Sequence, residues 1–187
     1  KALLEALAAN GSSAALQVVL AAANRSKQKS VQAHAASLIE QIAERNGWTA
    51  AQLADRTVPT GGFDADGTLE LDCGEGRLYT ARLDEHDAIV VLNADGREVK
   101  ALPGPRIDDE RLAVEAAKKL LSNARKEVKQ VFGAQGERLQ EAMCLQRSWP
   151  REDWESFVMG HPIVGRIAAR LVWHGNNRDG RETATFR

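Results

Sequence analysis

In the first 56 residues, apolar side chains recur every three to four positions, a spacing that predicts short amphipathic helices. Leu16, Val19 and Leu20 define the clearest apolar stripe. The breaks fall at Asn10-Gly11 and Asn46-Gly47, where glycine accommodates the left-handed conformation that ends many helices. Candidate N-caps, whose side chains accept backbone amide hydrogens, are Ser12 or Ser13, Ser30 and Thr49. Paired helices of this kind build α-solenoids, so we predict that residues 1–56 are the end of a HEAT-like repeat array.

The pattern changes at Pro59 and Gly61-Gly62, after which short segments rich in β-formers predict strands. The expected strands are Thr68–Asp72, Arg77–Leu83, Ala88–Leu92 and Arg97–Lys100. They are separated by turn signals such as Asp66-Gly67 and Asp95-Gly96, because Asp-Gly supplies the positive φ angles of a tight hairpin. Residues 57–105 are therefore predicted to form a small antiparallel β-meander. A meander of this size needs a helix against its apolar face to be stable.

A long helix is predicted after the Pro103-Gly104-Pro105 bend, with Asp108 or Asp109 as its N-cap. Gly133 and Gly136 weaken this helix and are points where it can kink. Its predicted apolar stripe consists of Leu112, Ala116, Leu120, Ala124, Val128, Val131, Gln135, Leu139 and Ala142. We expect this stripe to cover the apolar face of a neighbouring element.

Two shorter helices and the start of a second sheet are predicted for the rest of the chain. Ser148 is the expected cap of the first helix, with Pro150 in its first turn. The second helix follows the break at His161-Pro162 and carries Ile163, Ile167, Leu171 and Val172 on one face. Strand patterns begin at Trp173. Residues 106–187 are therefore mainly helical, and the three segments together predict an α+β fold.

Composition is that of a globular protein with a buried core, at 43% hydrophobic and 27% charged residues. The net charge of −1 argues against a general attraction to nucleic acid or anionic lipid. Two cysteines without a C-x-x-C motif indicate a reducing compartment, and no apolar run approaches the roughly 20 residues of a membrane span. We therefore expect a cytoplasmic location. The helical pattern at Lys1 and the strand pattern at Phe186-Arg187 predict that the chain is an internal piece of a larger protein.

Three acidic turns contain residue types that could form metal or acid–base sites. Asp64-Ala65-Asp66-Gly67 has the opening of a calcium loop, but no glutamate follows at the required distance. Asn93-Ala94-Asp95-Gly96 repeats the pattern with fewer acids. Asp84, His86 and Asp87 place two carboxylates beside an imidazole, although adjacent turn residues point apart. Hairpin turns and a solvated loop are the favoured interpretations.

Nucleophile and phosphate-binding motifs are incomplete in this sequence. Ser148, Asp153 and His161 are the residue types of a hydrolase triad, but no G-x-S-x-G elbow is present. Cys144 with His161 is unsupported because Cys144 lies on or near the apolar stripe of the long helix. Gly74-Glu75-Gly76 lacks the Lys and Ser/Thr of a phosphate loop. We therefore predict no catalytic residue, no metal site and no cofactor.

Basic residues cluster on the long helix and directly after it. The candidate contacts for nucleic acid or a partner are Lys118, Lys119, Arg125, Lys126, Lys129, Arg147 and Arg151. Trp149, Trp154 and Trp173 lie nearby, and arginine beside tryptophan suits a nucleic-acid groove. Glu115 and Glu127 are interleaved with these residues, which favours ion pairs on a solvated helix face instead. The tryptophans are then interpreted as core anchors.

Several stretches resemble one bacterial family. Asn46–Thr60, followed by Phe63–Gly67 and Leu71-Asp72, resembles a segment of the molybdate-metabolism-regulator-like (MolR-type) proteins, which share a domain of unknown function. Asn93–Gly96 and Ala169–Trp173 are similar to the same family in the same order. The resemblance implies helical, HEAT-like repeats upstream and a regulatory setting. It supplies no activity and no binding residue.

The leading hypothesis is a non-catalytic scaffold or protein-interaction segment of a larger multidomain regulatory protein. Its expected partners are other domains of the same chain or other proteins, and no membrane is expected among them. A nucleic-acid-associated regulatory module is the alternative. A second alternative is part of an enzyme whose site is completed by residues outside this chain.

Overall fold

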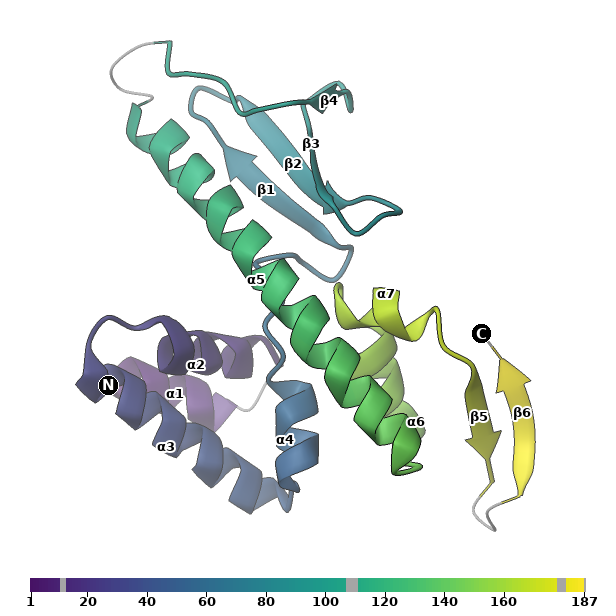
Figure 1. Ribbon diagram of the computed structural model, residues 1–187. Helices are drawn as coiled ribbons and strands as arrows, with labels where there is room; N and C mark the ends of the chain where they lie inside the picture. Colours follow the sequence, from purple (N-terminus) through teal and green to yellow (C-terminus); the bar gives the residue numbers. More distant parts are fainter. Residues whose placement is uncertain (11–12, 107–110, 178–180, 187) are drawn as a thin grey trace. The chain divides into compact units, whose positions relative to one another are not determined.

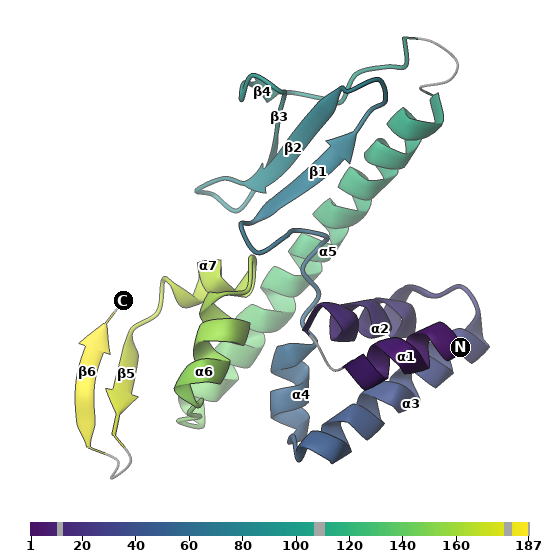
Figure 2. The same ribbon diagram turned by 180° about the vertical axis from the view of Figure 1, so that it is seen from behind.

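The computed structural model describes residues 1–10, 13–106, 111–177 and 181–186 (Figures 1 and 2). The predicted caps Ser12, Asp108 and Asp109 lie outside these residues. The chain divides into two compact units, Lys1–Pro59 and Thr60–Arg187. Within the described residues, no helix combines the length and apolar content that crossing a bilayer requires.

The first unit consists of four helices, as the apolar periodicity predicts. Its helices are α1 (Ala2–Asn10), α2 (Ser13–Arg25), α3 (Lys29–Asn46) and α4 (Ala50–Arg56). The core lies between α2 and α3, where Val19 and Ala35 are fully buried. On α1 the buried side chains are Leu4 and Ala8, whereas Leu3 is 74% exposed. The predicted apolar stripe of α2 is therefore confirmed, whereas α1 buries only some of its apolar side chains.

Two predicted N-caps of this unit have different outcomes. Thr49 caps α4 through a capping box, in which its Oγ1 accepts from the Gln52 amide at 3.2 Å and Gln52 Oε1 accepts from the Thr49 amide at 2.9 Å. Ser30 does not cap α3, which begins at Lys29 with Gln28 as its N-cap residue. The Gln28 carbonyl already accepts from the amides of residues 31 and 32, each at 3.0 Å. Ser30 therefore lies inside the first turn.

The predicted meander is confirmed as a four-stranded antiparallel sheet of order β1-β2-β3-β4. The strands are β1 (Thr68–Asp72), β2 (Leu78–Leu83), β3 (Ile89–Leu92) and β4 (Glu98–Val99). Leu69 pairs with Ala81 and Ala81 with Val91, so these side chains share one face. All three are buried, and Leu71 is fully buried beside them. The sheet thus has an apolar face that must be covered.

The helix that covers this face is α5 (Arg111–Cys144), which runs along β1 in the same unit (Figure 1). Its first turns bury Val114, Ala117 and Leu121. The predicted stripe through Leu112, Ala116 and Leu120 is wrong for these turns, since Leu112 is 79% exposed and the other two are also exposed. The sequence contains two adjacent apolar stripes that merge at residue 124, and packing against β1 selects the other one.

Two groups of glycines have opposite surroundings in this unit. Gly133 and Gly136 do not interrupt α5, and a methyl group added at either position would meet no atom within 4 Å. Gly61 has a positive φ of 72°, and a Cβ there would lie 3.2 Å from a methyl carbon of Val128 on α5. The segment that leads into the sheet therefore contacts α5 closely, with glycine at the contact.

The last part of the chain is less helical than predicted. It contains α6 (Arg151–Asp153), the π-helical segment η2 (Trp154–Met159), α7 (Val164–Ala168) and the paired strands β5 (Trp173–Asn176) and β6 (Glu182–Phe186). Ser148 is not a cap, because Pro150 is the N-cap residue of α6. The predicted helix through Val172 ends at Ala168, whose carbonyl accepts from the indole of Trp173 at 2.9 Å. The predicted second sheet is confirmed as a two-stranded hairpin.

Candidate functional site

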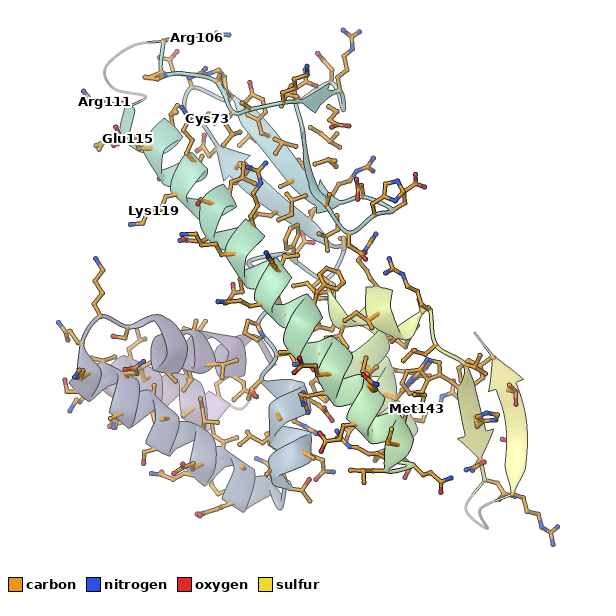
Figure 3. All side chains as sticks on the ribbon, in the orientation of Figure 1. Cys73, Arg106, Arg111, Glu115, Lys119 and Met143 are labelled. Carbon is orange, nitrogen blue, oxygen red and sulfur yellow. The ribbon has the colours of Figure 1, made fainter. Side chains whose placement is uncertain are left out.

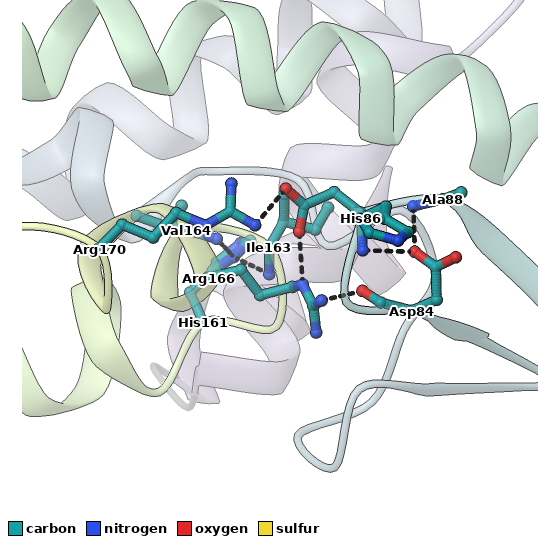
Figure 4. Close-up of polar contacts among 9 residues, drawn as sticks. Asp84, His86, Ala88, His161, Ile163, Val164, Arg166 and Arg170 are labelled. Atoms are coloured by element: carbon teal, nitrogen blue, oxygen red, sulfur yellow. Dashed lines mark hydrogen bonds and ion pairs between the residues drawn. The ribbon is translucent and has the colours of Figure 1, made fainter.

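The most specific cluster of charged groups joins the β2–β3 turn to α7 within the second unit (Figure 4). Asp87 Oδ1 accepts from Arg166 Nε at 2.8 Å, and Asp87 Oδ2 accepts from Arg170 Nη2 at 2.7 Å. Arg166 also donates through Nη2 to the main-chain carbonyl of Asp84. Both oxygens of one carboxylate are thus held by two guanidinium groups that lie far away along the sequence. We call Asp87, Arg166 and Arg170 the turn–helix tie.

The β2–β3 turn is shaped to present Asp87. Asp84 Oδ1 accepts from the amides of His86 at 2.9 Å and Ala88 at 2.8 Å, which closes the turn on its own side chain. Asp87 itself has a φ of +64°, an uncommon value for a residue other than glycine. The residue with this backbone conformation is the one whose carboxylate binds Arg166 and Arg170. The strain is therefore matched by two charged contacts at the same residue.

The position of Arg166 depends on the local structure before it. His161 is buried, and its Nδ1 accepts from the amides of Ile163 and Val164, each at 3.1 Å. These two bonds satisfy amides at the start of α7, as a capping side chain does. Gly165 then packs backbone to backbone, since a Cβ there would lie 2.3 Å from the Met159 carbonyl oxygen. An imidazole cap and a glycine contact thus place α7 against η2.

The electrostatics of the tie favour the ionised carboxylate. Burial raises the pKa of Asp87, but the hydrogen bonds and positive charges of Arg166 and Arg170 outweigh burial and lower that pKa below its ordinary value of 3.8. The Asp87 side chain is 16% exposed, against 30% for Arg166 and 55% for Arg170. The Arg170 contact is therefore well screened by water, and the Arg166 contact carries the larger share of the interaction.

The polar groups of this arrangement are engaged with one another and with the main chain. Each Asp87 oxygen accepts from a guanidinium, and His161 Nδ1 is occupied by main-chain amides. His86, which the sequence places beside the two carboxylates, is 81% exposed and does not join the tie. In the described part of the chain, no three His, Cys, Asp or Glu side chains are grouped to hold a metal ion. The convergent groups therefore hold elements together.

The two turns considered as calcium loops direct their oxygens into their own backbone. Asp64 accepts from the amide and the hydroxyl of Thr68, both at 2.8 Å, and these bonds lower the pKa of Asp64. Asn93 Oδ1 accepts from the amides of Asp95 at 3.1 Å and Arg97 at 2.9 Å. Asp84 repeats the same bond to the residue four positions ahead. The interpretation of the Asn93 segment as a hairpin turn is confirmed, since it joins β3 to β4, whereas the Asp64 segment is a turn that leads into β1 and joins no pair of strands.

The structure separates the predicted basic contacts into two groups. All five basic candidates on α5 are exposed: Lys118, Lys119, Arg125, Lys126 and Lys129. The two that follow the helix are engaged locally, since Arg147 stacks over the Trp149 ring at 4.4 Å and Arg151 pairs with Glu155 at 2.7 Å. The sequence therefore grouped residues that differ in their surroundings.

The tryptophans near these residues form an aromatic cluster. Trp173 contacts Trp149 and Trp154 edge to face, with ring centroids 5.8 and 5.4 Å apart, and Trp154 contacts Phe186 at 5.6 Å. These contacts tie the β5–β6 hairpin to η2. The three tryptophans are half-buried rather than deep in the core. Their edges pack on one another and on Phe186, so the rings anchor the hairpin at this position.

Sequence reasoning missed the partners of Asp87. It read the Asp84–Asp87 turn as a solvated loop, which holds for His86 but not for Asp87. One signal was present, because Arg166 and Arg170 are four residues apart in the helix that the sequence predicts, a spacing that puts two side chains on one face, although α7 itself ends at Ala168. Nothing local indicates which carboxylate they meet.

Comparison with known proteins finds one family model and one relative that are similar to this chain. Residues 96–187 match the model of a family described as "Domain of unknown function (DUF4132)". The chain is also similar to the "Uncharacterized protein YehI" of Escherichia coli (strain K12), with 32% identity over 149 residues. That match covers 80% of this chain but 12% of YehI. No solved structure matches the chain.

These matches correct the predicted resemblance. The likeness to molybdate-metabolism-regulator-like proteins is wrong, because the findings are a domain of unknown function and an uncharacterized relative. The regulatory setting and the HEAT-like repeats that this resemblance implied lose their support with it. The α+β fold does not depend on the resemblance and stands on the helices and the antiparallel sheet.

Proposed function

We propose that this chain is a non-catalytic scaffold segment that makes protein contacts within a larger multidomain protein. The turn–helix tie carries the proposal, because it uses both oxygens of its half-buried carboxylate to hold a sheet turn against α7. A catalytic carboxylate or imidazole needs a lone pair or proton available to a substrate. Asp87 and His161 instead direct theirs to neighbouring elements of the same unit.

Two further observations support the scaffold. The chain spans 12% of the length of YehI, as one segment of a much longer protein would. Large apolar side chains are also exposed in both units, including Leu3 at 74%, Met143 at 67% and Leu145 at 72%. Single exposed apolar residues are ordinary, but Met143 and Leu145 expose two large apolar side chains within three positions of the chain at the end of α5. Neighbouring domains of the same protein are the partners that we infer for such positions.

Hydrogen–deuterium exchange of the full-length protein tests this function. Arg166→Ala breaks the tie, and Arg151→Ala removes an equally charged but exposed residue as the matched control. A scaffold predicts that Arg166→Ala raises exchange in the β2–β3 turn, in α7 and in segments outside residues 1–187 that rest on them. The control is expected to change none of these. Loss of a chemical activity of the full-length protein with unchanged exchange would contradict the proposal.

A further inference from the structure

The outer side of α5 carries a concentration of positive charge that the scaffold does not use. Lys118, Lys119, Arg125, Lys126 and Lys129 are all exposed, and we call these five residues the basic face. Within the described residues, no ion pair involves any of them, whereas Arg111 on the same helix pairs with Glu115 at 3.2 Å. The ion pairs that the interleaved glutamates were expected to make with this cluster are therefore not formed among the described residues.

The charge is local and directional. Residues 111–129 contain six basic and two acidic side chains, a local charge of +4. The meander on the other side of α5 has the opposite sign, with ten acidic and four basic residues between 60 and 105. Figure 3 shows Lys119 pointing away from the sheet. A net charge near zero thus hides an acidic meander beside a basic stretch of α5, and a local positive charge of this kind attracts an anionic partner.

The spacing of the basic face suits a regular row of anions. Lys118 and Arg125 are seven residues apart, as are Lys119 and Lys126, so each pair is separated by about 10 Å on one side of the helix. The whole face extends over about 16 Å of a continuous helix. Ser122 and Asn123 are exposed between the cations and supply hydrogen-bond donors of the kind that contact phosphates. A rigid row of this kind matches a polymer with fixed charge spacing.

The same face has no groups for stacking on bases. Residues 111–131 include no aromatic side chain, and the nearby tryptophans pack edge to face in their own cluster. Single-stranded nucleic acids are bound by aromatic platforms combined with a basic groove. Duplex DNA instead presents one negative charge for about every 1.7 Å of its axis and can be held through its backbone alone. We propose that the basic face binds the phosphate backbone of duplex nucleic acid without reading its sequence.

Fluorescence anisotropy with a labelled duplex DNA of about 20 base pairs tests this proposal across about 50 to 200 mM salt. Contacts to three to five phosphates predict a log–log salt slope of about −3 to −4.5, which is a loss of roughly 60-fold or more over that range. Lys118→Ala, Lys119→Ala and Lys126→Ala in combination are expected to weaken binding at least about tenfold and to flatten the slope by 2 to 3. All three side chains are exposed, so thermal unfolding should be unchanged.

The matched control combines Arg82→Ala, Arg97→Ala and Lys100→Ala, which removes the same charge from exposed positions of the meander. Retained binding in the control supports a specific basic face. Four results would overturn the proposal: no salt-dependent binding at 50 mM, an equal loss in the control, tighter binding to a single strand of the same length, or equal affinity for polyglutamate.

Discussion

Replacing Arg166 by alanine is the perturbation for which the structure makes the sharpest stability prediction. The substitution removes the 2.8 Å bond from Nε to Asp87 and the bond from Nη2 to the Asp84 carbonyl. Hydrogen bonds that involve charged groups contribute about 1.5–3 kcal/mol each when buried, whereas exposed ion pairs contribute about 0.2–1 kcal/mol. Arg166 is 30% exposed and Asp87 is 16% exposed, so the interaction falls between these limits. We expect a total loss of about 2 kcal/mol.

The assay is urea denaturation of the purified chain at neutral pH, followed by fluorescence of the tryptophan cluster near α7. Arg151→Ala serves as the control, because its side chain is 87% exposed and its ion pair with Glu155 spans one helical turn. The control is expected to cost less than about 0.5 kcal/mol. A difference between the two variants of less than about 0.5 kcal/mol would refute the reasoning, because exposure would then not separate the two ion pairs.

Three further predictions follow from the same structure. The lowered pKa of Asp87 means that its carboxylate stabilises the fold above about pH 3.8, and that this contribution is lost as the pH falls through the lowered value. The difference in unfolding free energy between wild type and Asp87→Asn should therefore be constant from pH 7 to 5 and should disappear in acid. A difference that grows in acid would mean that the pKa shift has the opposite sign. Gly165→Ala places a Cβ 2.3 Å from the Met159 carbonyl oxygen and should lower the free energy of unfolding by more than about 2 kcal/mol. Gly133→Ala adds a methyl group that meets no atom within 4 Å, and it should raise the free energy of unfolding by up to about 1 kcal/mol. Calorimetry that shows equal effects of the two substitutions would contradict the backbone contact at Gly165. Thr49→Ala removes the capping box of α4 and should cost about 1 kcal/mol in a urea titration, with Thr49→Ser close to wild type.

Local patterns predicted the elements of this fold well. The ends of β1, the hairpin turns and the Thr49 cap each depend on residues within a few positions of one another, so the sequence alone specifies them. The buried face of α5 could not be predicted in the same way. Leu120 and Leu121 belong to different apolar stripes, and only contact with β1 determines that Leu121 is the buried one.

The candidate site was harder to predict because it depends on distant contacts. Asp87 and Arg166 are 79 residues apart, and no local periodicity connects a turn residue to a helix in another part of the chain. From the sequence, His161 is a candidate catalytic base only because histidine is a residue type of hydrolase triads. Its burial and its two bonds to the start of α7 are tertiary features. The exposed lysines of α5 were found from sequence, whereas their lack of ion pairs within the described residues was not.

The central claim is that the convergent charged groups of this chain act as a structural tie, and a double-mutant cycle between Asp87→Asn and Arg166→Ala measures it most directly. Unfolding free energies of wild type, both single variants and the double variant give the coupling between the two side chains. A structural tie predicts a coupling of about 1–2 kcal/mol, with the double variant only slightly less stable than either single variant. A coupling below about 0.3 kcal/mol would show that the two groups act independently and would contradict the account.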